Sequence, residues 1–172
     1  PTFCCGQTFR FSKEDCGIVE VCGDIAVHLV QRGIFLNGSF IATAGGQERI
    51  EDLLSAQKDV EGMAAESCAW LCRRYPDRSA SLRAVFAYSR GVHLLHQPIL
   101  ETIVGYLLSV QSSVSLVGKR LDALAHLFPS CRRLFDGREV YLFPTLVQLR
   151  SLTPSMLAEL RFGYRTAWLE KL

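Results

Sequence analysis

The spacing of the apolar residues changes once along this chain and divides it into two parts. Up to about residue 43, β-branched and aromatic residues occur in short runs that end at glycines, as in antiparallel strands joined by turns. After Ala44-Gly45-Gly46, apolar residues recur at intervals of three and four, which is the period of an amphipathic helix. We therefore predict an α+β fold. A small antiparallel β-sheet domain is expected over residues 1–46 and a helical domain over residues 47–172.

The strand region contains one strong turn signal. Residues 35–41 have the sequence FLNGSFI, in which Asn37-Gly38 lies between apolar residues. Because Asn-Gly readily adopts the positive φ angles of a tight turn, we predict a hairpin turn at this dipeptide.

The helical region divides into segments at its turn residues. Proline and glycine end helices, and threonine caps their start. We expect helices from near Glu48, from Val60 to Tyr75-Pro76, and over about Ser79–Tyr88 before Gly91. Others are expected over Ile99–Val117 with a polar break at residues 111–113, over Lys119–Phe128, and after Thr145 and Thr153, with an extended connection at residues 141–144.

Composition excludes some classes of protein. The chain is 49% hydrophobic and 21% charged, which is ordinary for a globular protein. Its formal net charge of +2 neither requires nor excludes nucleic acid as a partner. The seven cysteines are odd in number and irregular in spacing, which favours reduced thiols over a secreted disulfide framework. Cys68 and Cys72 lie one helical turn apart, but no histidine spacing completes a zinc site, so we expect no metal and no cofactor.

Targeting signals are also lacking in the sequence. No basic region followed by an apolar run marks a signal peptide, and no apolar stretch approaches the roughly 20 residues that span a bilayer. We expect no membrane partner and a cytoplasmic protein, associated with the nucleoid if it is bacterial. Motifs of serine hydrolases, zinc proteases, P-loop proteins and dinucleotide-binding proteins are absent from the sequence.

Separated segments of the chain resemble, in the right order, the 8-oxoguanine DNA glycosylase family. They are GQTFRF at residues 6–11, YSRGVHLL at 88–95, YLFPT at 141–145 and GYRTAWL at 163–169. The resemblance implies that the Gly6 carbonyl accepts a hydrogen bond from the N7 proton of 8-oxoguanine, and that Phe9 helps to wall the base pocket. The alternative is an ordinary strand start with Phe9 and Phe11 buried.

The same resemblance implies a DNA-binding set. Tyr164 would be the aromatic wedge, and Arg165 would serve the estranged base or a phosphate. Gln111 stands at the place of the asparagine that fills the vacated slot in the base stack, while Ser112 and Ser113 replace two further asparagines. Leu116 stands where an arginine would recognise the estranged cytosine. The alternatives are a polar turn between core helices and a tyrosine that caps a helix. The loop is also similar to that of 3-methyladenine-type glycosylases.

The implied function is base-excision repair, by cleavage of the N-glycosidic bond of a flipped damaged purine, with double-stranded DNA as the partner. The family's helix-hairpin-helix and Schiff-base lysine normally follow the GYR motif. None of the four lysines, Lys13, Lys58, Lys119 and Lys171, has that context, so we expect no catalytic residue in this chain. The chain is then a fragment of a longer enzyme or a naturally short protein. A non-catalytic DNA-binding or partner-binding module is the alternative, and a generic α+β domain with accidental matches is a third.

One expectation concerns assembly. If the helical half closes against later sequence, its last apolar residues lack partners in the isolated chain: Leu157, Leu160, Phe162, Trp168 and Leu169. Large exposed apolar surfaces favour association. We therefore expect self-association or a second polypeptide that completes the fold.

Overall fold

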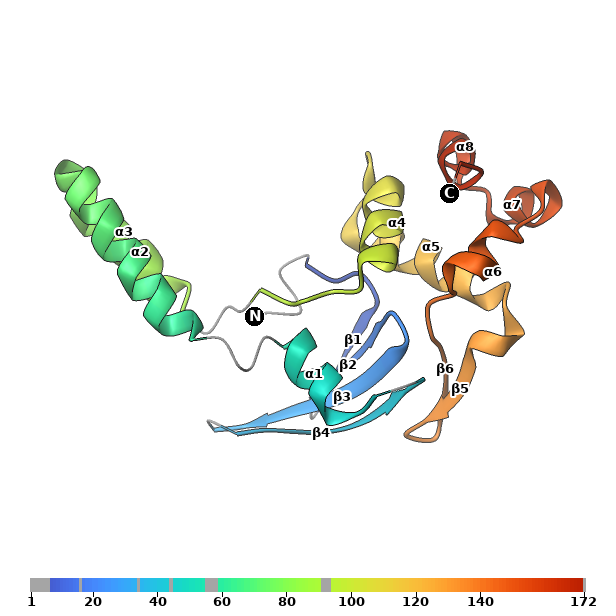
Figure 1. The fold of residues 1–172 in the computed structure, drawn as a ribbon, viewed down its shortest axis with the longest axis horizontal. Coiled ribbons are helices and arrows are strands. Elements are labelled where there is room, and N and C mark those ends of the chain that lie inside the picture. The colour runs from blue at the N-terminus through green and yellow to red at the C-terminus, as the bar shows by residue number, and fades with distance from the viewer. Residues whose placement is uncertain are drawn as a thin grey trace. The chain divides into compact units, whose positions relative to one another are not determined.

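The computed structural model describes residues 7–15, 17–33, 35–43, 45–54, 59–90 and 94–171. It forms two compact units: one comprises residues 1–7 and 47–96, and the other residues 8–46 and 97–172 (Figure 1). The described residues contain a four-stranded sheet, a two-stranded sheet and eight α-helices, so the predicted α+β class is confirmed. The boundaries of the compact units differ from the predicted boundary after residue 46, because the helices after Gln97 belong to the same unit as the sheet. The domain boundary between residues 46 and 47 stays a prediction.

The larger sheet is an antiparallel meander in the second unit. Its strands β1 (Phe11–Glu14), β2 (Gly17–Cys22), β3 (Ile25–Arg32) and β4 (Phe35–Ala42) pair in chain order. Gly23, with φ of +61°, lies between β2 and β3, and Gly33, with φ of +63°, lies between β3 and β4. The predicted β-rich first part is therefore confirmed, and the glycines at these two turns adopt the left-handed conformation that other residues disfavour.

The predicted hairpin turn at Asn37-Gly38 is wrong. Both residues lie inside β4, where Asn37 pairs with Val30 and Gly38 with Leu29. A Cβ atom at Gly38 would lie only 2.1 Å from the carbonyl oxygen of His28 on β3. The glycine therefore permits a close approach between two paired strands, and the chain turns at Gly33 instead.

A second hairpin covers one face of this sheet. Strands β5 (Arg132–Phe135) and β6 (Arg138–Tyr141) pair across a turn at Asp136-Gly137, where both φ angles are positive. Sequence reasoning missed this hairpin and expected only the extended connection that follows it. Five buried residues form the shared core of hairpin and sheet: Val19, Ala26, Phe135, Val140 and Leu142.

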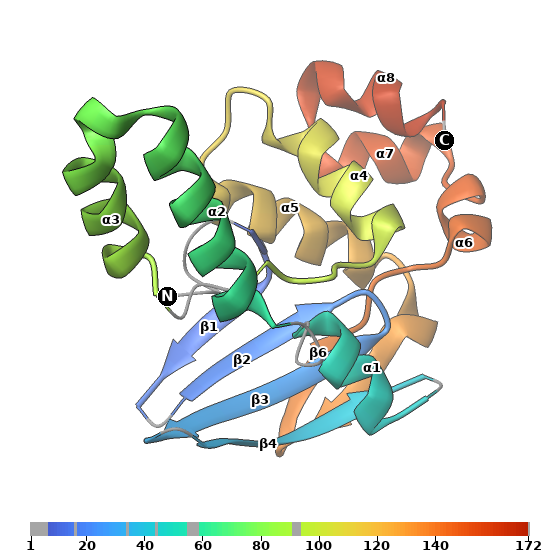
Figure 2. The same cartoon turned by 60° about the vertical axis from the view of Figure 1, so that its left-hand side comes forward.

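The helices of the second unit enclose its larger core. They are α4 (Ile99–Ser109), α5 (Val114–His126), α6 (Leu146–Arg150), α7 (Pro154–Leu160) and α8 (Thr166–Leu169), with short 3-10 turns η2 (Pro129–Cys131) and η3 (Gly163–Arg165) (Figure 2). The predicted caps are confirmed, since Thr145 accepts from the Gln148 amide and Thr153 from the Met156 amide. The core includes Val104, Leu108, Leu121, Leu124 and Phe128.

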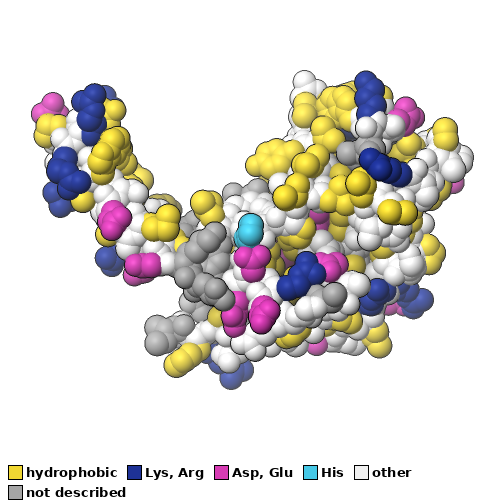
Figure 3. All heavy atoms as spheres, viewed as in Figure 1, with side chains coloured by type: hydrophobic (Ala, Val, Ile, Leu, Met, Phe, Trp, Pro, Cys, Tyr) yellow, Lys and Arg dark blue, Asp and Glu magenta, His cyan; other side chains and the backbone are white. Residues whose placement is uncertain are grey.

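The end of the chain does not carry the unpartnered residues that we expected. Leu157, Phe162 and Leu169 are only 2%, 2% and 4% exposed, because α7, η3 and α8 pack into the core that α5 and α4 form. Apolar side chains are exposed elsewhere in this unit. Figure 3 shows such side chains over α4, where Ile99, Ile103 and Tyr106 follow one helical face and Val110 lies directly after the helix. Self-association stays a prediction.

The first unit is mainly helical. It contains α1 (Gln47–Leu53), α2 (Val60–Arg74), the 3-10 turn η1 (Pro76–Arg78) and α3 (Ser79–Tyr88), and α2 and α3 pack together as a helical hairpin. Asp59 caps α2 by accepting from the Gly62 amide at 2.8 Å. The predicted end of α2 at Tyr75-Pro76 is confirmed, whereas Gly91 lies outside the described residues. Within the described ranges, no helix is long and apolar enough to cross a membrane.

Candidate nucleic-acid interface

Two loops that are far apart in the sequence meet in the second unit. The hydroxyl of Tyr164 donates to the carbonyl of Val110 at 3.5 Å, and the guanidinium of Arg165 donates to the same carbonyl. Arg165 also donates to the hydroxyl of Ser112 at 3.2 Å. The structure thus brings together the GYR segment and the loop between α4 and α5, which contain all five candidate DNA-binding residues.

Tyr164 is held in place but remains accessible. The residue is 52% exposed. The Arg165 guanidinium carbon lies 4.5 Å from the ring centroid, and the Trp168 ring stands edge-on at 5.3 Å. These contacts are a cation–π pair and a T-shaped aromatic pair, both of which fix the orientation of a ring. An exposed, oriented aromatic side chain is suited to stacking on a base.

The loop between α4 and α5 presents one of its three candidate side chains freely. Gln111 is exposed and has a φ of 53°, and its side chain forms no hydrogen bond with any residue that the structure describes. The Ser112 hydroxyl instead accepts from two arginines, and the Ser113 hydroxyl caps α5 by accepting from the Leu116 amide. Gln111 is therefore the member best placed to reach a ligand. DNA contacts by Ser112 and Ser113 stay predictions.

Arginines support this loop from inside the protein. Arg165 is only 7% exposed, and its hydrogen bonds to Val110 and Ser112 are internal. Arg120 donates to the carbonyl of Leu108 at 2.9 Å and to the Ser112 hydroxyl at 2.5 Å. Burial, and next the charge of Arg165, lower the pKa of Arg120. Sequence reasoning missed Arg120, because nothing in the sequence distinguishes it from the neighbouring Lys119 of the same helix.

The candidate base-pocket residues are partly described. Phe9 is half-buried, and its ring lies edge-on to Tyr106 at 6.5 Å. A Cβ atom at Gly105 would lie 2.8 Å from that ring, and one at Gly118 would lie 2.2 Å from the Phe9 carbonyl oxygen. Two glycines therefore let this segment approach α4 and α5 closely. The role of Phe9 in a pocket stays a prediction, and Gly6 lies outside the described residues.

A buried ionic network fixes this segment on the helices. Arg10 donates to Asp122 at 2.7 Å, to Glu101 at 3.5 Å and to the carbonyl of Tyr141, while Glu101 accepts from the Gly23 amide. Arg10 and Glu101 are 6% and 7% exposed. Burial raises the pKa of Glu101. The network joins the start of the sheet to α4 and α5, and it therefore positions Phe9.

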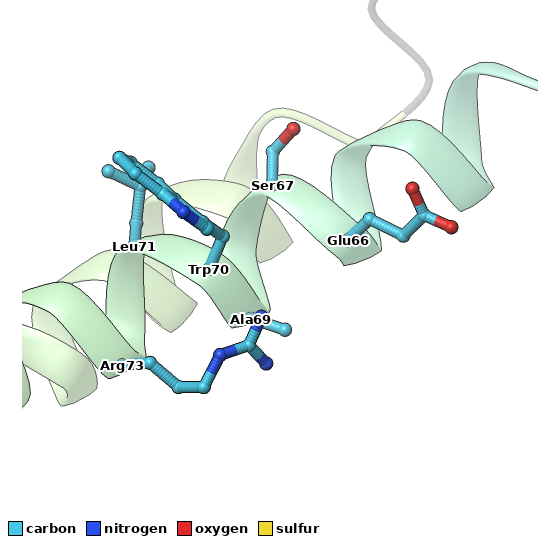
Figure 4. A pocket seen from close by; sticks show the side chains of 6 residues that line it. All are labelled: Glu66, Ser67, Ala69, Trp70, Leu71 and Arg73. Atoms are coloured by element: carbon cyan, nitrogen blue, oxygen red, sulfur yellow. The ribbon is translucent and has the colours of Figure 1, made fainter.

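The other surfaces of the described residues provide no comparable candidate binding site. A shallow groove on α2 is lined by Glu66, Ser67, Ala69, Trp70, Leu71 and Arg73 (Figure 4). All six belong to one helix, and one helix surface does not enclose a ligand. The described residues contain no cluster of three or more histidine, cysteine, aspartate or glutamate side chains that could hold a metal ion.

Comparison of the sequence with known proteins finds DNA glycosylases among its relatives. No family model matches the chain. An N-glycosylase/DNA lyase OGG1 from Arabidopsis thaliana is 26% identical over 98% of this chain. An N-glycosylase/DNA lyase from Saccharomyces cerevisiae is 30% identical over 81 residues, or 46% of this chain. The chain covers 45% of the plant protein and 22% of the yeast protein.

Solved structures agree with these sequence matches. The 8-oxoguanine glycosylase/lyase of Clostridium acetobutylicum, solved with double-stranded DNA that contains cytosine opposite 8-oxoguanine, aligns with a TM-score of 0.79 over 97% of this chain at 18% identity. MBOgg1, solved with a low-affinity DNA ligand, also aligns with a TM-score of 0.79, at 23% identity. The chain resembles the 8-oxoguanine DNA glycosylases. The match is partial, since the chain covers 55% of each of these structures.

Proposed function

We propose that this chain is part of a base-excision repair glycosylase of the 8-oxoguanine type, and that it holds duplex DNA where a damaged purine has been flipped out. The observation that carries the proposal is the junction of Tyr164 with the loop at residues 110–112. An enzyme that extrudes a base must support the disrupted stack and its orphaned partner base. An oriented, half-exposed tyrosine beside an exposed glutamine suits that task. In this proposal Gly6 and Phe9 line the pocket for the flipped base.

The resemblance also bears on which base lies opposite the lesion. Leu116 stands where the family has an arginine that recognises the estranged cytosine. An aliphatic side chain offers no hydrogen-bond donors and cannot replace a bidentate contact. We therefore propose that the chain discriminates less among opposite bases than its relatives do.

The DNA-binding surface can be tested by alanine substitution. Tyr164→Ala should weaken binding to a duplex with an abasic site by about 1–3 kcal/mol, because stacking of a base on an aromatic ring is worth that amount. Gln111→Ala and Arg165→Ala should weaken it as well. Dissociation constants are measured at low salt by fluorescence anisotropy.

Lys13→Ala is the control, because Lys13 is an exposed residue of β1 away from the junction. Its affinity should equal that of the parent chain. If all four variants bind like the parent, Tyr164 is a capping or packing residue and the proposed wedge is wrong.

A further part of the proposal is that residues 1–172 by themselves perform no base excision. The family forms a Schiff base through a lysine in a helix-hairpin-helix, and nucleophilic catalysis of this kind fails without it. None of the four lysines of the chain matches that context. Borohydride should therefore trap no covalent complex between these 172 residues and a duplex that contains 8-oxoguanine. Efficient trapping would contradict this, whereas DNA binding without trapping is also the behaviour of a non-catalytic DNA-binding module.

A further inference from the structure

Two arginines satisfy the carbonyl groups where α4 ends. Arg120 of α5 donates to the Leu108 carbonyl, and Arg165 of η3 donates to the Val110 carbonyl. The last carbonyl groups of a helix have no partner within that helix, so they need donors from elsewhere. Both arginines also donate to the hydroxyl of Ser112, at 2.5 Å and 3.2 Å. The backbone from Leu108 to Ser112 is therefore held from two sides.

This arrangement carries an energetic cost. Two positive guanidinium groups share one acceptor, and neither forms an ion pair with a carboxylate among the residues that the structure describes. The Nε atom of Arg165 is buried without a hydrogen-bond partner. Unpaired buried donors and close like charges both destabilise a fold. Arrangements that carry such costs are concentrated at functional sites, where they maintain a required geometry.

The geometry that is maintained includes a left-handed residue. Gln111 has a φ of 53°, a conformation that is disfavoured for residues other than glycine and asparagine. It lies between Val110 and Ser112, the two residues that the arginines hold. Release of either arginine would allow the loop to relax, and the side chain of Gln111 would then lose its fixed direction.

We infer that Arg120 is a positioning residue that fixes the loop at residues 110–113 so that Gln111 can enter the DNA stack. This inference rests on the function proposed above. In this inference Arg120 acts through the loop and not by contacting DNA, because its Nη1 atom donates both to the Leu108 carbonyl and to the Ser112 hydroxyl within the protein. The resemblance assigns no role to this arginine.

The first test needs no DNA. The amide of Ser112 donates to the Ser109 carbonyl at 2.9 Å, so its hydrogen exchange reports the order of the loop. Arg120→Ala should accelerate exchange at Ser112 by roughly tenfold or more, because hydrogen bonds from a charged group are lost. The matched control is Lys119→Ala, which removes the same charge from an exposed neighbouring position. Equal exchange in both variants would overturn the inference.

The second test separates positioning from direct DNA contact. Arg120→Ala should lower the preference for an abasic duplex over an intact duplex by roughly tenfold, and leave the dependence of affinity on salt unchanged. A direct phosphate contact would instead weaken both duplexes equally and reduce the salt slope by about one. That second outcome would overturn the inference, as would an unchanged preference.

Two further variants keep the test independent of folding. Ser112→Ala removes the shared acceptor without disturbing the core of α5, and should reproduce the loss of preference. Arg120→Lys keeps the charge, but its shorter side chain ends before the position of the Nη1 atom that makes both hydrogen bonds, so it should not restore the parent's preference. If the parent chain does not distinguish the two duplexes, the proposed function fails. If Gln111→Ala abolishes the preference and both Arg120→Ala and Ser112→Ala retain it, only the present inference fails.

Discussion

Arg10→Ala is expected to lower the free energy of unfolding by about 3–5 kcal/mol, which is typical when one partner of a buried ionic network is removed. Arg10 is 6% exposed and bonds to Glu101, Asp122 and the Tyr141 carbonyl. Its removal leaves the buried carboxylate of Glu101 without its counter-charge. Asp122 contributes less, because its side chain is half exposed and water can solvate it.

The measurement is urea unfolding of the parent chain and the variant at neutral pH. Arg132→Ala is the matched control, because Arg132 pairs with Glu139 on the surface, where both side chains are more than half exposed. That variant should lose less than about 1 kcal/mol, as surface ion pairs generally do. Similar losses in the two variants would show that the buried network does not stabilise the fold.

The second large effect is a fall in stability as pH rises, caused by Glu20. This residue is 1% exposed and accepts a hydrogen bond from the Thr8 hydroxyl at 3.2 Å. Burial, reinforced by the nearby charge of Glu101, raises the pKa of Glu20 from 4.5 to about 8. Below pH 4.5 the carboxyl is protonated in both the folded and the unfolded chain, so its ionisation does not lower the free energy of unfolding at that pH.

Between pH 4.5 and 8 the unfolded chain releases this proton and the folded chain retains it. Unfolding therefore becomes more favourable by about 1.4 kcal/mol per pH unit, or roughly 5 kcal/mol over the interval. Glu20→Gln should remove this contribution and flatten the stability profile measured by urea unfolding at pH 5 and pH 8. Glu139→Gln, at an exposed position, should keep the parent's profile. A parent slope that persists in Glu20→Gln would contradict the assignment to Glu20.

Local signals in the sequence were sufficient for most helices. Period and caps located α2, α6 and α7, because a hydroxyl before a helix and a proline after it act on the residues next to them. The same reasoning failed at Gly38, where the constraint is the His28 carbonyl on the neighbouring strand. A glycine required by tertiary contact looks the same in sequence as a glycine required by a turn.

At the candidate site, too, sequence reasoning found some features and missed others. The resemblance indicated that Tyr164 and Gln111 belong together, and the structure brings their loops into contact. It did not indicate that Arg120 and Arg165 point inward and hold the loop. The direction of these side chains depends on how α4, α5 and η3 pack together, which the sequence does not reveal. The β5–β6 hairpin was missed although Asp136-Gly137 is a turn signal, since its strands are only four residues long.

The buried network around Arg10 also has a kinetic consequence. Its acidic partners Glu101 and Asp122 lie 91 and 112 residues further along the chain. The four-stranded meander forms from neighbouring segments, but its first strand is secured only after α4 and α5 have been synthesised. Contacts between such distant residues require a large loop to close before any stabilisation is gained, and chains dominated by them fold slowly. During synthesis, the sheet therefore remains without its full ionic anchor until Asp122 has emerged from the ribosome.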